Sequence, residues 1–205
     1  MREANRRAQR PAAAALAGLL WLAVPAPGSA AERVALLIGN SAYPGAVGQS
    51  SAWERLANPV NDVQLVSNAL WADGFEVHTL TNGSYAEISR QIEAFAELTR
   101  KADVAVVYYA GHGFEYGRRN YLVPVDAPTS VQAEALPERY IDFDRIVKAA
   151  ARAAKVNVFF LDACRTGGAF VTVGGAKAGA ASRPIDDIQY PQGAPLAILY
   201  STARG

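Results

Sequence analysis

Short runs of apolar residues alternate along the chain with segments of helical periodicity. Four runs are apolar enough to be strands buried on both faces, and a fifth alternates as a half-buried strand: 34–38, 104–109, 156–161, 196–200 and, alternating, 75–80. Between them, three segments place apolar residues on one helical stripe: 59–73, 85–100 and 141–154. Strands that alternate with helices predict an α/β domain, with a mainly parallel sheet and helices on both faces.

Glycines interrupt this rhythm at two places. Gly111 and Gly113 follow the apolar run 104–109 directly, and we expect them to break that strand. From 166 to 195 the composition shifts to Gly, Ala, Pro and Ser. Such a composition is typical of a flexible linker, so we expect 166–195 to separate two parts of the domain.

The first thirty residues have a different pattern. Four arginines precede an apolar Ala/Leu-rich stretch, and small residues follow at 28–31. This order is typical of a secretory signal peptide, and the apolar stretch is shorter than the roughly 20 residues of a membrane-spanning helix. We expect residues 1–30 to be a signal peptide and 31–205 an exported domain, periplasmic or extracellular, without stable membrane insertion. An uncleaved membrane anchor is the alternative.

Composition narrows the classes of function. The 20 Lys and Arg nearly balance the 19 Asp and Glu, with a net charge of +1, which gives no electrostatic reason to expect nucleic acid as a partner. A hydrophobic fraction of 51% is enough to form a core. One Cys and 2 His exclude a disulfide framework and a Cys-rich zinc site. We expect neither a metal nor another cofactor.

Two of the buried strands lead into reactive side chains. His112 follows one of them and Cys164 the other. Because the carboxyl ends of neighbouring parallel strands meet at one edge, the pair would suit a thiolate nucleophile with an imidazole partner. Gly113 would offer its N–H to an oxyanion. The alternative is a small buried Cys and a turn His; Tyr108 and Tyr109 are expected to be packing residues.

Four short segments contain motifs that bear on the class of protein: 33–40 (RVALLIGN), 61–62 (ND), 108–113 (YYAGHG) and 161–168 (LDACRTGG). Cys164 follows His112 by 52 residues, and about 50 separate the two in caspases. The chain resembles the caspase-like cysteine peptidases over roughly residues 32–204, within them the metacaspase, paracaspase and bacterial orthocaspase branches. Asp162 stands where true caspases have Gln, which points away from that branch.

The resemblance implies a cysteine endopeptidase. His112 and Cys164 would be the catalytic pair, and the backbone N–H groups of Gly113 and Cys164 would hold the oxyanion. It also places Asp62 and Asp162 in the pocket for the residue before the scissile bond. Two carboxylates there would favour Arg or Lys in a protein or peptide substrate. The alternatives are a helix-capping Asp62 and a strand-end Asp162 without a role.

The resemblance has three further implications. Lys177 and Arg183 lie in the linker where family members are often cleaved, so we expect self-processing after one of them. Some members need calcium, and the sequence leaves that dependence open. Family members continue beyond the last strand, so we expect the domain to be truncated at its C-terminus. A catalytically incompetent caspase-like binding or scaffold module is therefore the alternative function.

Overall fold

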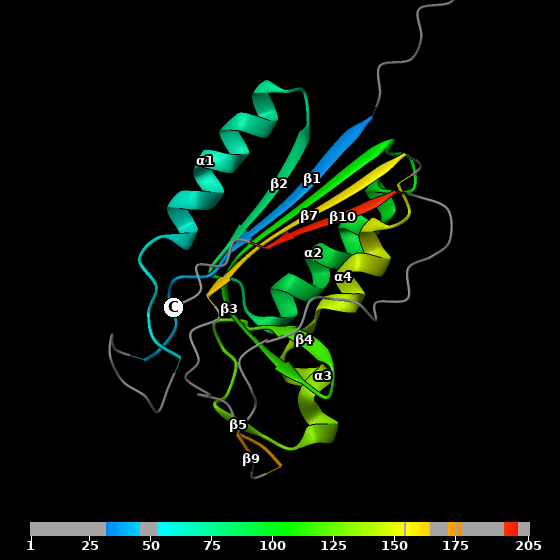
Figure 1. Ribbon diagram of the computed structural model, residues 1–205. Helices are drawn as coiled ribbons and strands as arrows, with labels where there is room; N and C mark the ends of the chain where they lie inside the picture. The colour runs from blue at the N-terminus through cyan, green and yellow to red at the C-terminus, as the bar shows by residue number, and fades with distance from the viewer. Residues whose placement is uncertain are drawn as a thin grey trace, which may run out of the picture. The chain divides into compact units, whose positions relative to one another are not determined.

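A seven-stranded sheet, five of whose strands are parallel neighbours, forms the centre of the computed structural model (Figure 1). The structure describes residues 32–45, 53–153, 155–164, 172–174, 176–177 and 195–200. The strand order is β10 (Leu196–Tyr200), β7 (Val156–Cys164), β3 (Val104–Tyr116), β1 (Arg33–Gly39) and β2 (Glu76–Thr81). Every neighbouring pair in this order is parallel. The predicted α/β fold with a mainly parallel sheet is confirmed, whereas the predicted signal peptide lies outside the described residues.

Helices cover both faces of the sheet. Helix α1 (Pro59–Ala72) packs on one face, and α2 (Tyr85–Leu98) and α4 (Phe143–Ala150) pack on the other (Figure 1). Successive residues of β1 serve opposite layers, as the period of a strand requires. Ala35 and Leu37 belong to the core under α1, and Leu36 and Ile38 to the core under α2 and α4.

Local sequence signals explain where these helices begin. Pro59 opens α1, where its missing N–H costs nothing. Ser84 and Glu87 form a capping box at the start of α2. The carboxylate of Asp126 adds to it by accepting a hydrogen bond of 2.8 Å from the backbone N–H of Tyr85.

Strand β3 is longer than its sequence predicts. It runs to Tyr116 instead of stopping at residue 109, so the prediction that Gly111 and Gly113 break the strand was wrong. Beyond Ala110 the backbone stays paired, with β7 as far as His112 and then with the antiparallel strand β4 (Arg119–Leu122). These continuous pairings hold the glycines in extended conformation.

Six short elements complete the described part of the fold, and one of them, β6, joins the main sheet through β4. They are β5 (Ser130–Val131), η1 (Ala133–Ala135), α3 (Leu136–Arg139), β6 (Ile141–Asp142), β8 (Thr172–Val173) and β9 (Ala176–Lys177). The predicted helix 141–154 begins only at Phe143, because β6 pairs with β4.

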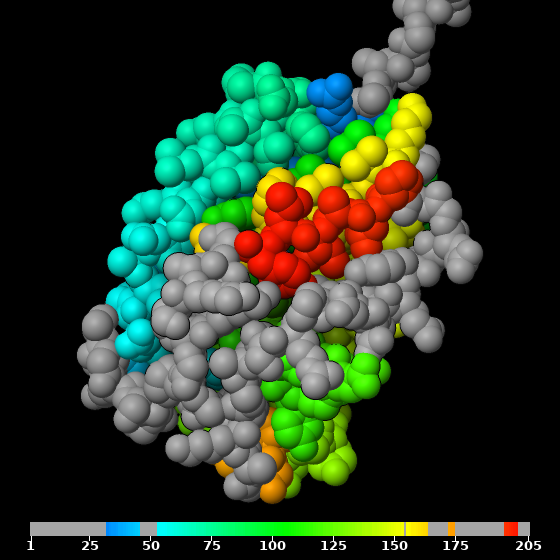
Figure 2. Space-filling model, in the orientation of Figure 1, coloured from blue at the N-terminus to red at the C-terminus, as the bar shows by residue number. Residues whose placement is uncertain are grey.

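The predicted linker is partly strand where the structure describes it. There β8 pairs in parallel with β5 and antiparallel with β9, and Lys177 lies in β9. Arg183 lies outside the described residues. Figure 2 shows β10, in red, beside β7 on the viewed face of the molecule. None of the helices in the described ranges is long and apolar enough to cross a membrane.

Candidate active site

His112 and Cys164 occupy partner positions in two adjacent strands. The parallel register of β3 and β7 pairs Ala110 with Asp162 and His112 with Cys164. Neighbouring strands lie about 4.8 Å apart, so the two backbone positions are side by side on one face of the sheet, near its carboxyl edge. The predicted adjacency of the two strands is therefore confirmed. The side chain of Cys164 lies outside the described part of the structure.

The imidazole of His112 is buried and held in one orientation. The residue is only 3% exposed, and its ring lies 4.6 Å from that of Tyr43 and 5.3 Å from that of Trp53, between ring centres. Its Nε2 is 2.8 Å from the backbone carbonyl oxygen of Glu54. Since a carbonyl oxygen only accepts, Nε2 carries the hydrogen, and Nδ1 of the neutral ring keeps its lone pair.

Burial also sets the protonation state of this ring. Loss of solvation lowers the pKa of His112 below its usual value, while the carbonyl and the carboxylate of Glu54 act in the opposite direction. The burial effect is the larger of the two, so the neutral form predominates at pH 7. A neutral imidazole with a lone pair on Nδ1 is the form that accepts a proton.

Two tyrosine hydroxyls hold the backbone of His112. Its N–H donates to Tyr43 Oη at 3.1 Å, and Tyr109 Oη donates to its carbonyl oxygen at 2.6 Å. The Tyr43 hydroxyl donates in turn to the carbonyl of Val123 at 3.0 Å. Burial raises the pKa of Tyr43 to about 12, so its phenol stays neutral. Tyr109 was expected to be a packing residue; it is fully buried, and its hydroxyl also holds the backbone of His112.

The two acids predicted to share a pocket do interact. Asp62 lies in the first turn of α1, which packs on the sheet face that carries Tyr108 and Ala110. Asp162 is the register partner of Ala110 and lies on that face. Burial, and after it the negative charge of Asp162, raises the pKa of Asp62. The structure thus brings Asp62 and Asp162 within electrostatic reach of each other.

Gly113 follows His112 in β3 and is paired with Leu122 of β4. A small cavity of about 30 Å³ adjoins it, lined mainly by apolar side chains that include Leu161, Ala163 and Tyr200. Gly113 itself is tightly enclosed, because a Cβ there would lie 3.3 Å from the Cβ of Ala163. Gly113 directly follows His112 in β3, and its role as an oxyanion donor stays a prediction.

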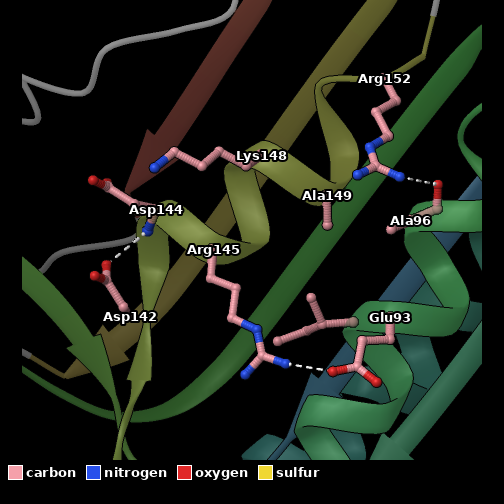
Figure 3. A pocket seen from close by; sticks show the side chains of 9 residues that line it. Glu93, Ala96, Asp142, Asp144, Arg145, Lys148, Ala149 and Arg152 are labelled. Atoms are coloured by element: carbon pink, nitrogen blue, oxygen red, sulfur yellow. Dashed lines mark hydrogen bonds and ion pairs between the residues drawn. The ribbon is translucent and has the colours of Figure 1, made fainter. Parts of the chain in front are cut away.

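A larger pocket, of about 380 Å³, lies between α2 and α4. Figure 3 shows that its arginines reach across to the wall formed by α2: Arg145 bonds to Glu93 at 2.9 Å and Arg152 to the carbonyl of Ala96 at 3.5 Å. Because α2 and α4 cover the sheet face opposite α1, this pocket is separate from the Asp62–Asp162 pair. Within the described ranges, no three His, Cys, Asp or Glu side chains converge as metal ligands would.

Sequence reasoning missed several residues that surround His112. The carbonyl of Glu54 is a backbone group, and no residue type predicts it. The contact of Tyr109, by contrast, had a signal in the sequence. Tyr109 and Gly111 are two residues apart and share one face of β3, so a strand predicted to continue past Gly111 would have placed the Tyr109 ring beside that glycine. Tyr43 and Trp53 belong to no recognised motif. They lie outside the helices and strands, in the loop after β1, so no periodicity predicts that they pack against His112.

Comparison with known proteins assigns the family. The family model described as "Caspase domain" matches residues 32–205, so the chain belongs to the caspase-like cysteine peptidase family. The mouse "Mucosa-associated lymphoid tissue lymphoma translocation protein 1 homolog" is 34% identical over 139 residues, which is 66% of this chain and 15% of that protein. Its human counterpart is 33% identical over 137 residues, again 66% and 15% of the two chains.

The chain therefore spans about 15% of the length of these curated relatives. Among solved structures, a protein from Geobacter sulfurreducens matches with a TM-score of 0.47 and 18% identity, over 65% of this chain and 50% of that one.

Proposed function

We propose that the chain is a cysteine endopeptidase that hydrolyses the bond after Arg or Lys. The observation that carries the proposal is the register pairing of His112 with Cys164, with His112 held as a neutral ring that keeps a lone pair on Nδ1. Membership of the caspase-domain family supports the same reaction class. A buried imidazole beside a cysteine position is the arrangement that nucleophilic catalysis by a thiolate needs.

The proposed reaction has two stages. His112 takes the proton of the Cys164 thiol, and the sulfur attacks the carbonyl carbon of the scissile bond. The backbone N–H groups of Gly113 and Cys164 stabilise the negative oxygen that forms. The protonated imidazole then gives its proton to the leaving amine, which leaves a thioester. Water, deprotonated by His112, hydrolyses the thioester and restores the thiol. Thiol, imidazole and backbone suffice, so the proposal includes no cofactor.

The preference for a basic residue rests on the acidic pair. Asp62 and Asp162 interact on the face of the sheet that also carries the His112–Cys164 positions. Two neighbouring carboxylates repel each other, and a guanidinium or ammonium group between them would remove that repulsion. An Asp in the same pocket would add a third negative charge. We therefore propose protein or peptide substrates with Arg or Lys before the cleaved bond.

Fluorogenic peptides that end in Arg, Lys or Asp test the proposal. We expect cleavage after Arg and Lys, none after Asp, and loss of activity in Cys164→Ala and His112→Gln. His78→Gln is the matched control, because this half-buried histidine lies in β2 and its Nε2 is 2.9 Å from the carboxylate of Glu76. A folded protein that cleaves none of the peptides would contradict the proposal and favour a caspase-like binding module.

A further inference from the structure

Tyr108 lies beside the acidic pair rather than in a purely apolar core. It is the register partner of Phe160, two residues before the partner of Asp162. Residues two apart in a strand share a face, so Tyr108 and Asp162 are diagonal neighbours on adjacent strands, within reach of a long side chain. Tyr108 is only 8% exposed, and its ring packs with residues under α1.

The hydroxyl of Tyr108 hydrogen-bonds to the carboxylate of Asp162 and is also within electrostatic reach of Asp62. Burial, followed by these two negative charges, raises the pKa of Tyr108. Its phenol therefore stays protonated and acts as the donor to Asp162. Tyr108, expected to be a packing residue, is buried in the core under α1 and also contacts the acidic pair.

We propose that Tyr108 is a positioning residue for the cation pocket: its hydroxyl donates to Asp162 and fixes that carboxylate so that it and Asp62 bind one basic side chain. This inference rests on the proposed function, because the role of Tyr108 is to orient a carboxylate in the proposed pocket for Arg or Lys.

Hydrogen-bond chemistry explains why a phenol suits this position. An ionised carboxylate has about four acceptor sites and no donor. One bond from Tyr108 fixes the plane of Asp162 and leaves its other sites for the substrate. A guanidinium needs a fixed plane more than an ammonium does, because it binds carboxylates through two parallel N–H groups. Loss of the Tyr108 hydroxyl should therefore weaken the binding of Arg substrates more than the binding of Lys substrates.

Tyr108→Phe tests this proposal while keeping the ring that packs under α1. With the Arg peptide we expect KM to rise about tenfold and kcat to change less than about twofold, since the lost bond is one to a charged group. The rise for the Lys peptide should be smaller. Tyr116→Phe, on the same strand but distant from the acids in the register, is the matched control and should leave both constants unchanged.

Binding measurements separate this proposal from the proposed function. Calorimetric titration of Cys164→Ala with an Arg-terminated peptide amide should give a Kd that rises about tenfold when Tyr108→Phe is added. A tenfold rise in Kd supports the role of Tyr108 whether or not the wild-type protein hydrolyses the peptide. Absence of hydrolysis by the wild-type protein would contradict only the proposed function. An unchanged Kd and KM in Tyr108→Phe would overturn the inference, and so would an equal loss for Arg and Lys accompanied by a lower Tm.

Discussion

Tyr109 donates a hydrogen bond of 2.6 Å to the carbonyl oxygen of His112, three residues further along the same strand. The contact requires the phenol to lie along β3, over the position of Gly111. A Cβ at Gly111 would be 2.6 Å from Tyr109 Oη and 2.8 Å from Tyr43 Oη. Gly111, the first glycine of the YYAGHG motif, thus leaves room for the two hydroxyls that hold the backbone of His112.

Removing either hydroxyl should therefore reduce activity. Tyr43→Phe leaves the buried N–H of His112 without its acceptor, and Tyr109→Phe removes the donor to its carbonyl. Each should cost about 1–3 kcal/mol of unfolding free energy and lower kcat by displacing the imidazole from its productive position. Urea denaturation and steady-state kinetics measure both effects.

Tyr85→Phe is the matched control for these variants. It removes an equally short hydrogen bond, of 2.6 Å to the carbonyl of Pro137, at a place that does not contact His112. We expect a small loss of stability and unchanged kcat. If Tyr109→Phe keeps wild-type kcat, the tyrosine contributes to packing only.

Gly111→Ala should damage the site more than either tyrosine variant. The added methyl group would overlap two buried phenol oxygens, and overpacking of this kind costs about 1–3 kcal/mol. We expect a lower midpoint in urea and almost complete loss of kcat. Gly117→Ala is the control: its Cβ would meet nothing within 4 Å, although its φ of +59° makes the substitution mildly strained. Equal loss of activity in both variants would contradict the steric explanation.

The periodicity of apolar residues predicted the strands and helices, but nothing in the sequence predicted the contacts made by backbone groups. The strands around Leu36 and Phe159 and the helix containing Ile92 were predicted because their apolar residues repeat with the period of the element. The extension of β3 past Gly111 was not, since cross-strand pairing overrides the usual effect of glycine. The carbonyl of Glu54 had no sequence signal at all.

The buried His112 should titrate at a lower pH than an ordinary histidine. Burial lowers its folded-state pKa below the unfolded value of 6.5. Neutral His112 thus stabilises the fold above about pH 6.5, and this contribution is lost as pH falls through the lowered folded-state pKa. The acidic limb of kcat/KM should lie at the same lowered pKa. NMR titration of the two histidines, with His78→Gln for assignment, measures it; a value at or above 6.5 would contradict this prediction.

The acidic pair makes substrate binding depend on pH. Burial and the charge of Asp162 raise the pKa of Asp62, so Asp62 becomes protonated at a higher pH than an ordinary aspartate. KM for the Arg peptide should rise as pH falls through that raised value. In Asp162→Asn, KM should be higher at pH 7, and the further rise should begin at a lower pH because one cause of the raised pKa is gone. A pH profile of KM that is identical in the two proteins would show that the acids do not share a substrate.

Self-processing after Lys177 requires a local rearrangement. Lys177 is paired with Thr172 across β8 and β9, and a peptidase site binds its substrate as an extended, unpaired strand. Strands of two residues hold few hydrogen bonds, so the pair opens at little cost. We expect mass spectrometry to find wild-type chain cleaved after residue 177 or 183, and to find Cys164→Ala intact. Lys177→Gln with Arg183→Gln should prevent the cleavage, whereas Lys155→Gln, which alters only an ion pair with Asp103 before β7, should not. Cleavage of Cys164→Ala at the wild-type rate would assign the event to another protease.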